Sequence, residues 1–257
     1  MNIGLIGYGK MGRLLETVSG SRGHRVVTVL DPVNRPGERY DPSKADVLLE
    51  FTGPETAAEN ITATAGAGMA VVSGSTGWYH KLPEVAAAVE AGGGALLWSA
   101  NFSLGVNIFF RLCSYAAALV DPFEEYDVGG LEAHHNKKAD SPSGTAKILM
   151  ERVLSAMTRK TKVLWERDGD RPEKAAVHFS SLRVGSLPGV HSLVFDSPAD
   201  TIEITHTARG REGFALGAVI AAEWLAGSPA PDGSGGAGPG RRRGVFTMND
   251  VLKDILP

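Results

Sequence analysis

The sequence predicts an α/β protein of two domains, one built on a parallel sheet and the other on an open mixed sheet. In the first half, short apolar runs alternate with helical stretches, which is typical of a parallel sheet covered by helices. Beyond Asp121, strand-like segments follow one another with one convincing helix among them. Strands grouped in this way indicate an α+β domain with a mixed or antiparallel sheet.

The strands of the first half are expected where apolar runs of strand length occur, at residues 3–6, 26–30, 47–51, 70–73 and 95–98. We expect the helices between them to begin near Lys10, Pro54 and Leu82, and another to cover residues 104–119. Pro54 suits the first turn of a helix, where its missing N–H has no intrahelical partner.

In the second half, residues 124–133, 176–184, 190–197 and 200–208 are strand-like, and residues 144–157 are helical. A helix over residues 212–226 and a strand-then-helix segment over 245–256 resemble the first half. We therefore predict one domain from residues 1–101 and 212–257, and a second from residues 102–211. The glycine-rich stretch 227–240 and the basic run Arg241-Arg242-Arg243 are expected in a surface loop.

The composition is that of a soluble globular protein, with 43% hydrophobic and 21% charged residues and a net charge of −3. These values do not favour a nucleic acid or a membrane as partner. Cys113 is the only cysteine, which excludes an internal disulfide, and its apolar surroundings favour a buried packing role. With no signal peptide and no apolar run of about 18 residues, we expect a cytoplasmic protein.

A glycine motif follows the first predicted strand, where Gly7, Gly9 and Gly12 match G-x-G-x-x-G. A chain with 32 glycines gives about 0.5 such matches by chance, so the context decides. Here the motif follows a strand, opens a helix, and is followed by a second strand that ends in Asp31. This is the arrangement of a Rossmann dinucleotide-binding domain.

Each element of the motif has a physical task. Gly7 permits the tight turn, Gly9 lets the backbone approach the pyrophosphate, and Gly12 lets the helix pack on the strand. The N–H groups at the helix start favour the pyrophosphate charge. Asp31 is expected to accept hydrogen bonds from the adenosine ribose, which favours NADH, whereas Arg35 nearby could meet the 2′-phosphate of NADPH.

Two further loops are expected at the carboxyl ends of strands, where ligands of this fold bind. They contain Phe51 and Thr52, and then Gly74, Ser75 and Thr76. Their small and hydroxyl-bearing residues could approach the nicotinamide ribose, although simple turn chemistry would explain them as well.

The most informative segment is residues 132–146, with the sequence EAHHNKKADSPSGTA. Ser143 is a natural N-cap, and the amides of Gly144 and Thr145 would lie in the first turn of the helix that follows. Such a helix start binds anions, and Lys138 would add a positive charge. A small carboxylate substrate is the expected occupant, beside a histidine whose ordinary pKa of about 6.5 suits a proton donor.

Two other interpretations apply to this segment. Paired histidines can bind a metal, but adjacent residues seldom face one ion and no carboxylate follows at helical spacing, so we expect no metal. The histidines could also be ordinary polar loop residues in front of a capped helix.

The same segment resembles the E-x-H-H-x-x-K-x-D-x-P-S-G-T-A signature of the dihydrodipicolinate reductases. It is matched at Glu132, His134, His135, Lys138, Asp140, Pro142, Ser143, Gly144, Thr145 and Ala146. The resemblance also covers, in order, the glycine loop, Phe51-Thr52, residues 74–77 and 100–107, Pro188-Gly189, His191, residues 206–211 and residues 248–252. The chain resembles the short form of the family, with a G-x-G-x-M-G loop.

The resemblance implies reduction of 4-hydroxytetrahydrodipicolinate, or the dihydrodipicolinate formed from it, to tetrahydrodipicolinate in the diaminopimelate route of lysine biosynthesis. His134 would supply a proton and Lys138 would bind a substrate carboxylate, while His135, Ser143, Gly144 and Thr145 hold the same ligand. NADH or NADPH would contact the residues of the glycine loop and of three further segments. These are Gly7, Tyr8, Gly9, Lys10, Met11, Gly12, Asp31, Phe51, Thr52, Gly74, Ser75, Thr76, Ala100, Asn101 and Phe102. The family also implies a homotetramer formed through the mixed sheet.

The chain departs from the family pattern at Ser75 and Ser141, where Thr and Ala are common, and at Val190, where Glu is common. Val190 precedes His191 and removes a carboxylate from that turn. Two alternatives remain at this level. One is another Rossmann amino-acid or aldehyde dehydrogenase, which the glycine motif fits equally well, and the other is a non-catalytic NAD-binding regulator.

Overall fold

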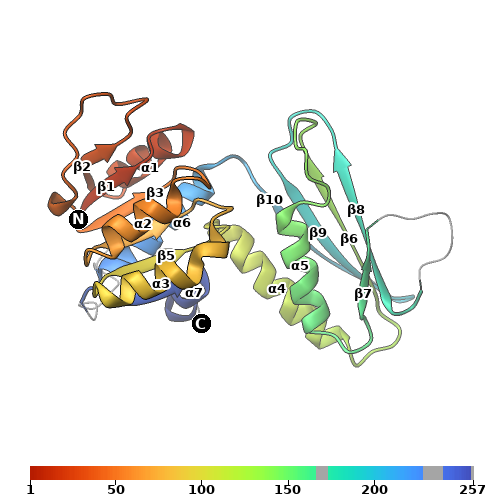
Figure 1. Cartoon of the computed structure of the whole chain (residues 1–257). Helices are drawn as coiled ribbons and strands as arrows, with labels where there is room; N and C mark the ends of the chain where they lie inside the picture. Colours follow the sequence, from red (N-terminus) through yellow and green to blue (C-terminus); the bar gives the residue numbers. More distant parts are fainter. Residues whose placement is uncertain (166–172, 228–239, 256–257) are drawn as a thin grey trace. The chain divides into compact units, whose positions relative to one another are not determined.

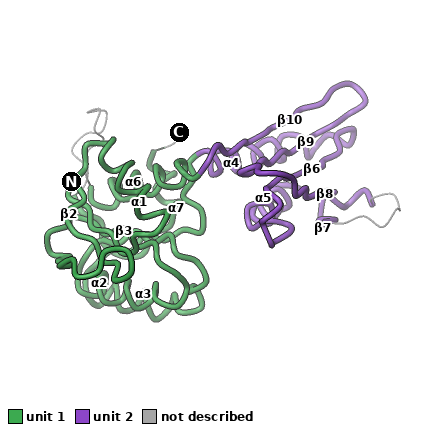
Figure 2. The backbone as a smooth tube through the Cα atoms, turned by 90° about the horizontal axis from the view of Figure 1, so that it is seen from above, with its two compact units in different colours: residues 1–104, 211–257 green, residues 105–210 purple. Residues whose placement is uncertain are grey.

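The structure, a computed structural model, describes residues 1–165, 173–227 and 240–255 and divides the chain into two compact units (Figures 1 and 2). Unit 1 comprises Met1–Leu104 and Arg211–Pro257, and unit 2 comprises Gly105–Gly210. The first boundary lies three residues beyond the one expected from the sequence. The reason is Phe102, whose side chain is buried in the core of unit 1. Its backbone also packs closely against residue 217, because a Cβ on Gly217 would lie 1.7 Å from the Phe102 carbonyl oxygen.

Unit 1 contains a parallel sheet of the order β11-β5-β4-β3-β1-β2. Its strands are β1 (Asn2–Ile6), β2 (Arg25–Leu30), β3 (Val47–Glu50), β4 (Ala70–Ser73), β5 (Ala95–Trp98) and β11 (Gly244–Thr247). From β1 the chain passes to β2 on one side and then to β3 on the other. In sheets of this kind, ligands bind at the carboxyl ends of the strands beside that reversal.

Helices cover both faces of this sheet (Figure 1). On one face lie α1 (Lys10–Ser21), α6 (Glu212–Ala226) and α7 (Met248–Ile255), and on the other α2 (Ala57–Ala65) and α3 (Leu82–Ala91). Successive side chains of a strand point to opposite faces of the sheet, so Leu5 packs with the first group of helices, whereas Ile6 packs with the second. Two short 3₁₀ turns, η1 (Pro42–Lys44) and η2 (Tyr79–Lys81), were not expected from the sequence.

Unit 2 contains a mixed sheet of the order β10-β9-β6-β8-β7. Its strands are β6 (Asp127–His134), β7 (Lys162–Leu164), β8 (Ala176–Arg183), β9 (Val190–Asp196) and β10 (Thr201–Thr207). β8 runs parallel to β6 and β7, whereas β9 runs antiparallel to β6 and β10. The sequence did not reveal β7, because three residues at a sheet edge are too few for a period-two pattern.

The helices α4 (Leu104–Val120) and α5 (Gly144–Ser155) pack on one face of the mixed sheet. Phe110, Leu149, Phe179 and Phe195 form part of that core together with Cys113, which is fully buried. Burial raises the pKa of the Cys113 thiol to about 12, in agreement with the expected packing role.

Among the described residues, no helix combines the length and the apolar character that crossing a membrane requires. Most of the expected surface loop, residues 228–239, lies outside the described residues. Within the basic run that follows, Arg242 is not simply solvated. Its guanidinium lies 3.8 Å from the centre of the Trp224 ring and 2.9 Å from Asp254.

Candidate active site

The glycine turn between β1 and α1 has close backbone contacts that leave no room for side chains. Gly7 has a φ of +94°, and a Cβ there would lie 2.3 Å from the carbonyl oxygen of Phe51. A Cβ on Gly12 would lie 2.3 Å from the carbonyl oxygen of Gly7. Gly9, in contrast, has open space beside it, and no side chain caps α1. The turn therefore fits a pyrophosphate held by the first amides of α1.

Tyr8 is buried in this turn, and two guanidinium groups lie over its ring. The Arg35 guanidinium lies 4.2 Å from the ring centre and that of Arg13 lies 5.1 Å from it. Arg35 also forms an ion pair with Glu38 at 3.1 Å. Lys10, at the start of α1, is exposed, so its ammonium is accessible to an anion.

Asp31 follows β2 as expected, but its carboxylate is already engaged by the protein. It accepts hydrogen bonds from the amide of Tyr8 at 2.6 Å, from the amide of Val33 at 2.9 Å, and from the amide and side chain of Asn34 at 2.8 and 2.9 Å. Burial raises the pKa of Asp31, but these hydrogen bonds outweigh that effect and lower it to about 2. Asp31 therefore carries a charge at neutral pH, and ribose hydroxyls must share it with these donors.

A cavity of about 210 Å³ lies at the carboxyl-terminal side of the parallel sheet. Five of the residues that line it were singled out from the sequence, namely Met11, Phe51, Gly74, Ala100 and Phe102. Ser99, Arg211 and Phe214 also line it, although they were not among the expected cofactor residues. A Cβ on Gly74 would lie 2.1 Å from the Phe51 ring, so a glycine there lets the two loops meet.

The other expected cofactor residues lie on the same loops. Thr52 and Thr76 are exposed, whereas the Ser75 side chain is buried, with its hydroxyl 2.9 Å from the amide of Thr52. Asn101 accepts a hydrogen bond from the amide of Ser103 through its side-chain oxygen at 2.9 Å. Ser75 therefore connects the two loops through this hydrogen bond, whereas Thr52 and Thr76 remain accessible to a ligand.

Glu50, at the end of β3, is a further residue of unit 1 that the sequence did not indicate. Its side chain is fully buried and accepts hydrogen bonds from both neighbouring loops. The donors are the amide and hydroxyl of Thr52 at 3.0 and 2.5 Å, the Ser73 hydroxyl at 2.6 Å and the Ser75 hydroxyl at 2.9 Å. An acidic residue at the end of an apolar strand was the available signal, because a buried carboxylate must have partners.

In unit 2, strand register places four polar side chains in one row across the sheet. Ser181 of β8 lies opposite Glu132 of β6, Glu132 lies opposite His191 of β9, and His191 lies opposite His206 of β10. Along β6 the alternate residues Val128 and Gly130 lie in the same face, opposite the core residues Phe195 and Leu193. One face of β6 is therefore apolar near the start of the strand and polar near its end, where Glu132 and His134 lie.

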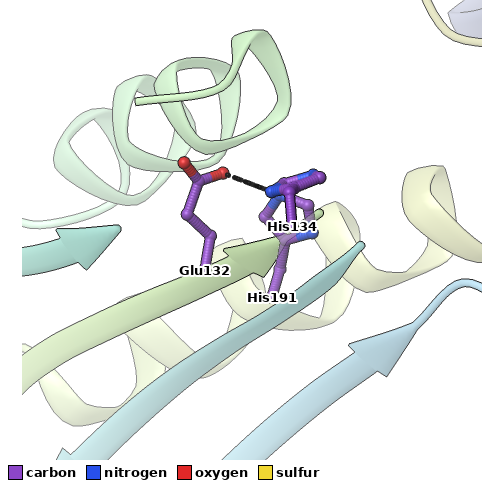
Figure 3. A group of neighbouring side chains, drawn as sticks. All are labelled: Glu132, His134 and His191. Atoms are coloured by element: carbon purple, nitrogen blue, oxygen red, sulfur yellow. Dashed lines mark ion pairs between the residues drawn. The ribbon is translucent and has the colours of Figure 1, made fainter. Parts of the chain in front are cut away.

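Glu132 is the centre of this polar group (Figure 3). It is fully buried and forms an ion pair with Arg183 at 2.9 Å, while its other oxygen lies 3.3 Å from a ring nitrogen of His191 and 3.5 Å from one of His134. Figure 3 shows its carboxylate turned towards the two imidazoles, whose ring centres lie 5.1 Å apart. The sequence signature contained Glu132, but only the register of β6 and β9 shows its contact with His191.

His134 is buried, with 8% of its surface exposed, and its pKa is lowered to about 4. Burial is the main cause, because it disfavours the charged imidazole. Glu132 opposes this effect, while the charges of His191, Lys138 and Arg183 add to it. The expectation of an ordinary histidine pKa is therefore wrong for the ligand-free protein, in which His134 is neutral at pH 7.

Lys138 does not present a free ammonium in this structure. Its Nζ lies 2.8 Å from a carboxylate oxygen of Asp140, and Asp140 also accepts a hydrogen bond from the amide of Gly144. The hydrogen bond from Lys138 lowers the pKa of Asp140. A carboxylate of the chain itself thus lies at the ammonium and the helix start where a substrate carboxylate was expected.

Ser143 caps α5 as predicted, since its hydroxyl accepts a hydrogen bond from the amide of Ala146 at 3.1 Å. Its own amide donates to Glu132 at 2.9 Å, which connects the helix start to the imidazole group. Thr145 and His135 are half-buried, and Nδ1 of His135 has no partner among the described residues. The structure thus connects Ser143 to His134 through Glu132.

Glu132, His134 and His191 offer donor atoms within 4.8 Å of one another, a grouping that can hold a metal. The guanidinium of Arg183 lies 2.9 Å from the same carboxylate, however, and its charge opposes a second cation. Val190 lies opposite Ala133 and, by alternation along β9, points away from the face of His191. The departure from the family pattern at this position therefore leaves the imidazole group intact.

Two family models match almost the whole chain. The model described as dihydrodipicolinate reductase, N-terminus, matches residues 1–102, and the one described as dihydrodipicolinate reductase, C-terminus, matches residues 105–252. A solved structure described as dipicolinate-bound dihydrodipicolinate reductase from Paenisporosarcina sp. TG-14 has the same fold. It covers 100% of this chain and 99% of its own with a TM-score of 0.71 and 19% identity.

Curated relatives carry the corresponding activity in their names. A 4-hydroxy-tetrahydrodipicolinate reductase from Christiangramia forsetii is 38% identical over 100% of this chain and 99% of its own length. One from Archaeoglobus fulgidus is 35% identical over 95% and 96%. These matches confirm the resemblance found in the sequence. The chain belongs to the dihydrodipicolinate reductase family, the NAD(P)H-dependent oxidoreductases of the diaminopimelate route to lysine.

Proposed function

We propose that this chain reduces 4-hydroxytetrahydrodipicolinate, or the dihydrodipicolinate formed from it, to tetrahydrodipicolinate with NADH or NADPH. The observation that carries the proposal is the segment from Glu132 to Ala146. It combines a buried imidazole, an ammonium group and the start of a helix within one unit. A small dicarboxylate is the class of substrate that these groups recognise together.

Unit 1 would hold the cofactor, which supplies the hydride when bound. The open side of Gly9 and the first amides of α1 would receive the pyrophosphate. The cavity lined by Met11, Phe51, Gly74, Ala100 and Phe102 would receive the nicotinamide end. Thr52, Ser75, Thr76 and Asn101 would then line the adjoining loops.

Unit 2 would hold the substrate. Lys138 would exchange the carboxylate of Asp140 for one of the substrate, while Ser143, Gly144 and Thr145 at the start of α5 would receive the second. The solved relative from Paenisporosarcina is described as dipicolinate-bound, and dipicolinate is a ligand of this class. His135 would contact the same ligand, and His134 would donate the proton that completes the reduction.

A dicarboxylate would also prepare His134 for this step. With a pKa of about 4 the imidazole is neutral at pH 7, so it holds one ring proton and lacks the second proton that an imidazolium would donate. Two negative charges beside the ring would raise that pKa, because an opposite charge within about 4–6 Å favours the imidazolium. Substrate binding would therefore be accompanied by proton uptake.

The adenosine end favours NADH over NADPH. Asp31 remains charged at neutral pH and would repel a 2′-phosphate, while it can accept from ribose hydroxyls. Arg35, which could bind that phosphate, already contacts Tyr8 and forms an ion pair with Glu38. NADPH must therefore compete for a guanidinium that the protein itself engages.

We also infer that the chain acts in the cytoplasm as a homotetramer assembled through the mixed sheet of unit 2. The face turned away from α4 and α5 exposes Leu131, Leu182 and Val184, and apolar side chains on an open sheet face favour a partner. Light scattering should give four chains for the native protein and fewer for Leu182→Glu. A monomer for the native protein would contradict the assembly.

The function is tested with substrate made freshly from pyruvate and aspartate semialdehyde by the preceding synthase. The purified protein should consume NADH, and NADPH more slowly, only while the synthase is active. Loss of absorbance without the synthase would indicate a different dehydrogenase. Tight NADH binding without any turnover would indicate a non-catalytic regulator.

A further inference from the structure

The Glu132 carboxylate has two differently engaged oxygens. Oε1 accepts hydrogen bonds from the amide of Ser143 at 2.9 Å, the hydroxyl of Ser181 at 2.8 Å and the guanidinium of Arg183 at 2.9 Å. Three donors from two segments, β8 and the start of α5, hold this oxygen in place. Its position is therefore fixed independently of the imidazoles.

Oε2, the second oxygen, faces the two rings (Figure 3). It lies 3.5 Å from Nδ1 of His134 and 3.3 Å from Nε2 of His191. Among the described residues it forms no hydrogen bond that satisfies strict geometry, and neither does Nδ1 of His134. Both atoms are buried and need a partner, and they lie 3.5 Å apart. Nε2 of His191, although it is slightly nearer to Oε2, also lies 3.3 Å from the Ser143 hydroxyl.

The other ring nitrogen of His134 faces a different space. A Cβ on Gly189 would lie 3.1 Å from Nε2 of His134, so Nε2 adjoins the volume that a side chain at residue 189 would fill. Glycine keeps this side of the ring free. The ring therefore has one nitrogen turned to a fixed carboxylate and one turned to an open position.

We propose that Glu132 is a positioning residue that holds a proton on Nδ1 of His134 and thereby leaves Nε2 as the nitrogen that exchanges a proton with substrate. This inference rests on the proposed function, because it assigns the direction of a proton transfer that the reaction requires. A carboxylate that orients a histidine in this way also stabilises the imidazolium. Glu132 is the carboxylate among the groups that shift the pKa of this ring most strongly.

The groups that face His134 come from four elements. Glu132 on β6 favours its charged form, whereas His191 on β9, Arg183 on β8 and Lys138 in the loop before α5 disfavour it. Burial disfavours it further. Removing the charge of Glu132 would leave burial and these three positive groups, all of which disfavour the imidazolium, so Glu132 is the side chain that favours it.

The proton transfer balances with water as the source of protons. As the substrate accepts a proton from Nε2, the N–H bond breaks and its electron pair stays on the ring. The imidazole is left neutral, with its remaining proton on Nδ1 towards Glu132. A proton from solvent water then restores Nε2–H.

The test compares Glu132→Gln with Ser181→Ala, a matched control that removes one donor to Oε1 and leaves Oε2 unchanged. Imidazole ¹⁵N resonances of the ligand-free proteins report both the tautomer and the titration midpoint of His134. The wild type should carry its neutral-state proton on Nδ1. Glu132→Gln should lower the midpoint by about 1 to 3 units, the effect of an adjacent opposite charge. Ser181→Ala should leave the midpoint unchanged.

The pH profile of kcat supplies the second readout. In Glu132→Gln the decline at high pH should begin at lower pH by a similar interval, and Glu132→Asp should restore part of the loss. A wild-type proton on Nε2, or an unchanged midpoint in Glu132→Gln, would overturn the proposal. If Glu132→Gln does not fold, the wild-type tautomer still decides it. The resonances need no turnover, so a protein without reductase activity but with the Nδ1 tautomer would contradict only the proposed function.

Discussion

Replacing Glu50 by Leu should loosen the two loops that adjoin the proposed nicotinamide site. The substitution removes the acceptor of four hydrogen bonds, from Thr52, Ser73 and Ser75. The amide of Thr52 keeps a second acceptor in the Ser75 hydroxyl, 2.9 Å away, and exposed Thr52 can turn its hydroxyl to water. The hydroxyls of Ser73 and Ser75 are buried and have no such route.

Each buried donor left without a partner costs about 1–3 kcal/mol, so Glu50→Leu, which leaves two of them, should lower the free energy of unfolding by about 2–6 kcal/mol. Glu50→Gln is the matched control. Its amide oxygen can still accept from Thr52 and Ser75, and the Ser73 hydroxyl can accept from the amide nitrogen. This variant should lose no more than about 1.5 kcal/mol.

Urea unfolding measures the stability of both variants, and NADH fluorescence titration measures the dissociation constant. Glu50→Leu should bind NADH about tenfold more weakly, because loops that must be ordered on binding reduce affinity. Glu50→Gln should stay within about threefold of the wild type on the same reasoning. A Leu variant that equals the Gln variant in both measurements would refute the role assigned to Glu50.

Three further predictions concern the charged groups. Asp140→Asn should lower the KM for the dicarboxylate several-fold without changing NADH affinity, because Lys138 no longer holds a competing carboxylate. An unchanged KM in steady-state assays would argue against this competition. Asp31→Ser should shift the ratio of kcat/KM towards NADPH, since the charge that repels a 2′-phosphate is removed, and a ratio equal to that of the wild type would show that Asp31 is not the determinant. The stability that neutral His134 confers is fully present above about pH 6.5 and is lost as pH falls towards 4, because the unfolded chain then binds a proton that the folded one excludes. The urea midpoint should therefore fall further between pH 7.5 and pH 5 in the wild type than in His134→Gln. An equal fall in the two proteins would contradict the lowered pKa of His134.

The local parts of the site were predictable because their signals lie within a few residues. The glycine turn needs its three glycines for contacts within the turn and with Phe51, and Ser143 caps the helix that follows it directly. Lengths and apolar periods were likewise sufficient to place the strands of both sheets, apart from the short β7.

The non-local parts could not be predicted in the same way. Glu132 meets His191 because β6 and β9 pair in one register, and no pattern within either strand states that register. Glu50 receives Ser73 and Ser75 from the neighbouring strand and its loop. The pKa of His134 depends on burial, which only the assembled core determines.

The most direct test of the account compares wild type and His134→Gln in the synthase-coupled assay, with the NADH dissociation constant measured on the same samples. We expect kcat to fall by about 10²–10⁴-fold, the usual contribution of a general acid, while NADH affinity stays within about twofold. Because His134 lies in unit 2 and the expected cofactor residues lie in unit 1, the two effects should separate. An unchanged kcat, or equal losses of turnover and NADH binding, would contradict the assignment of His134 as the proton donor.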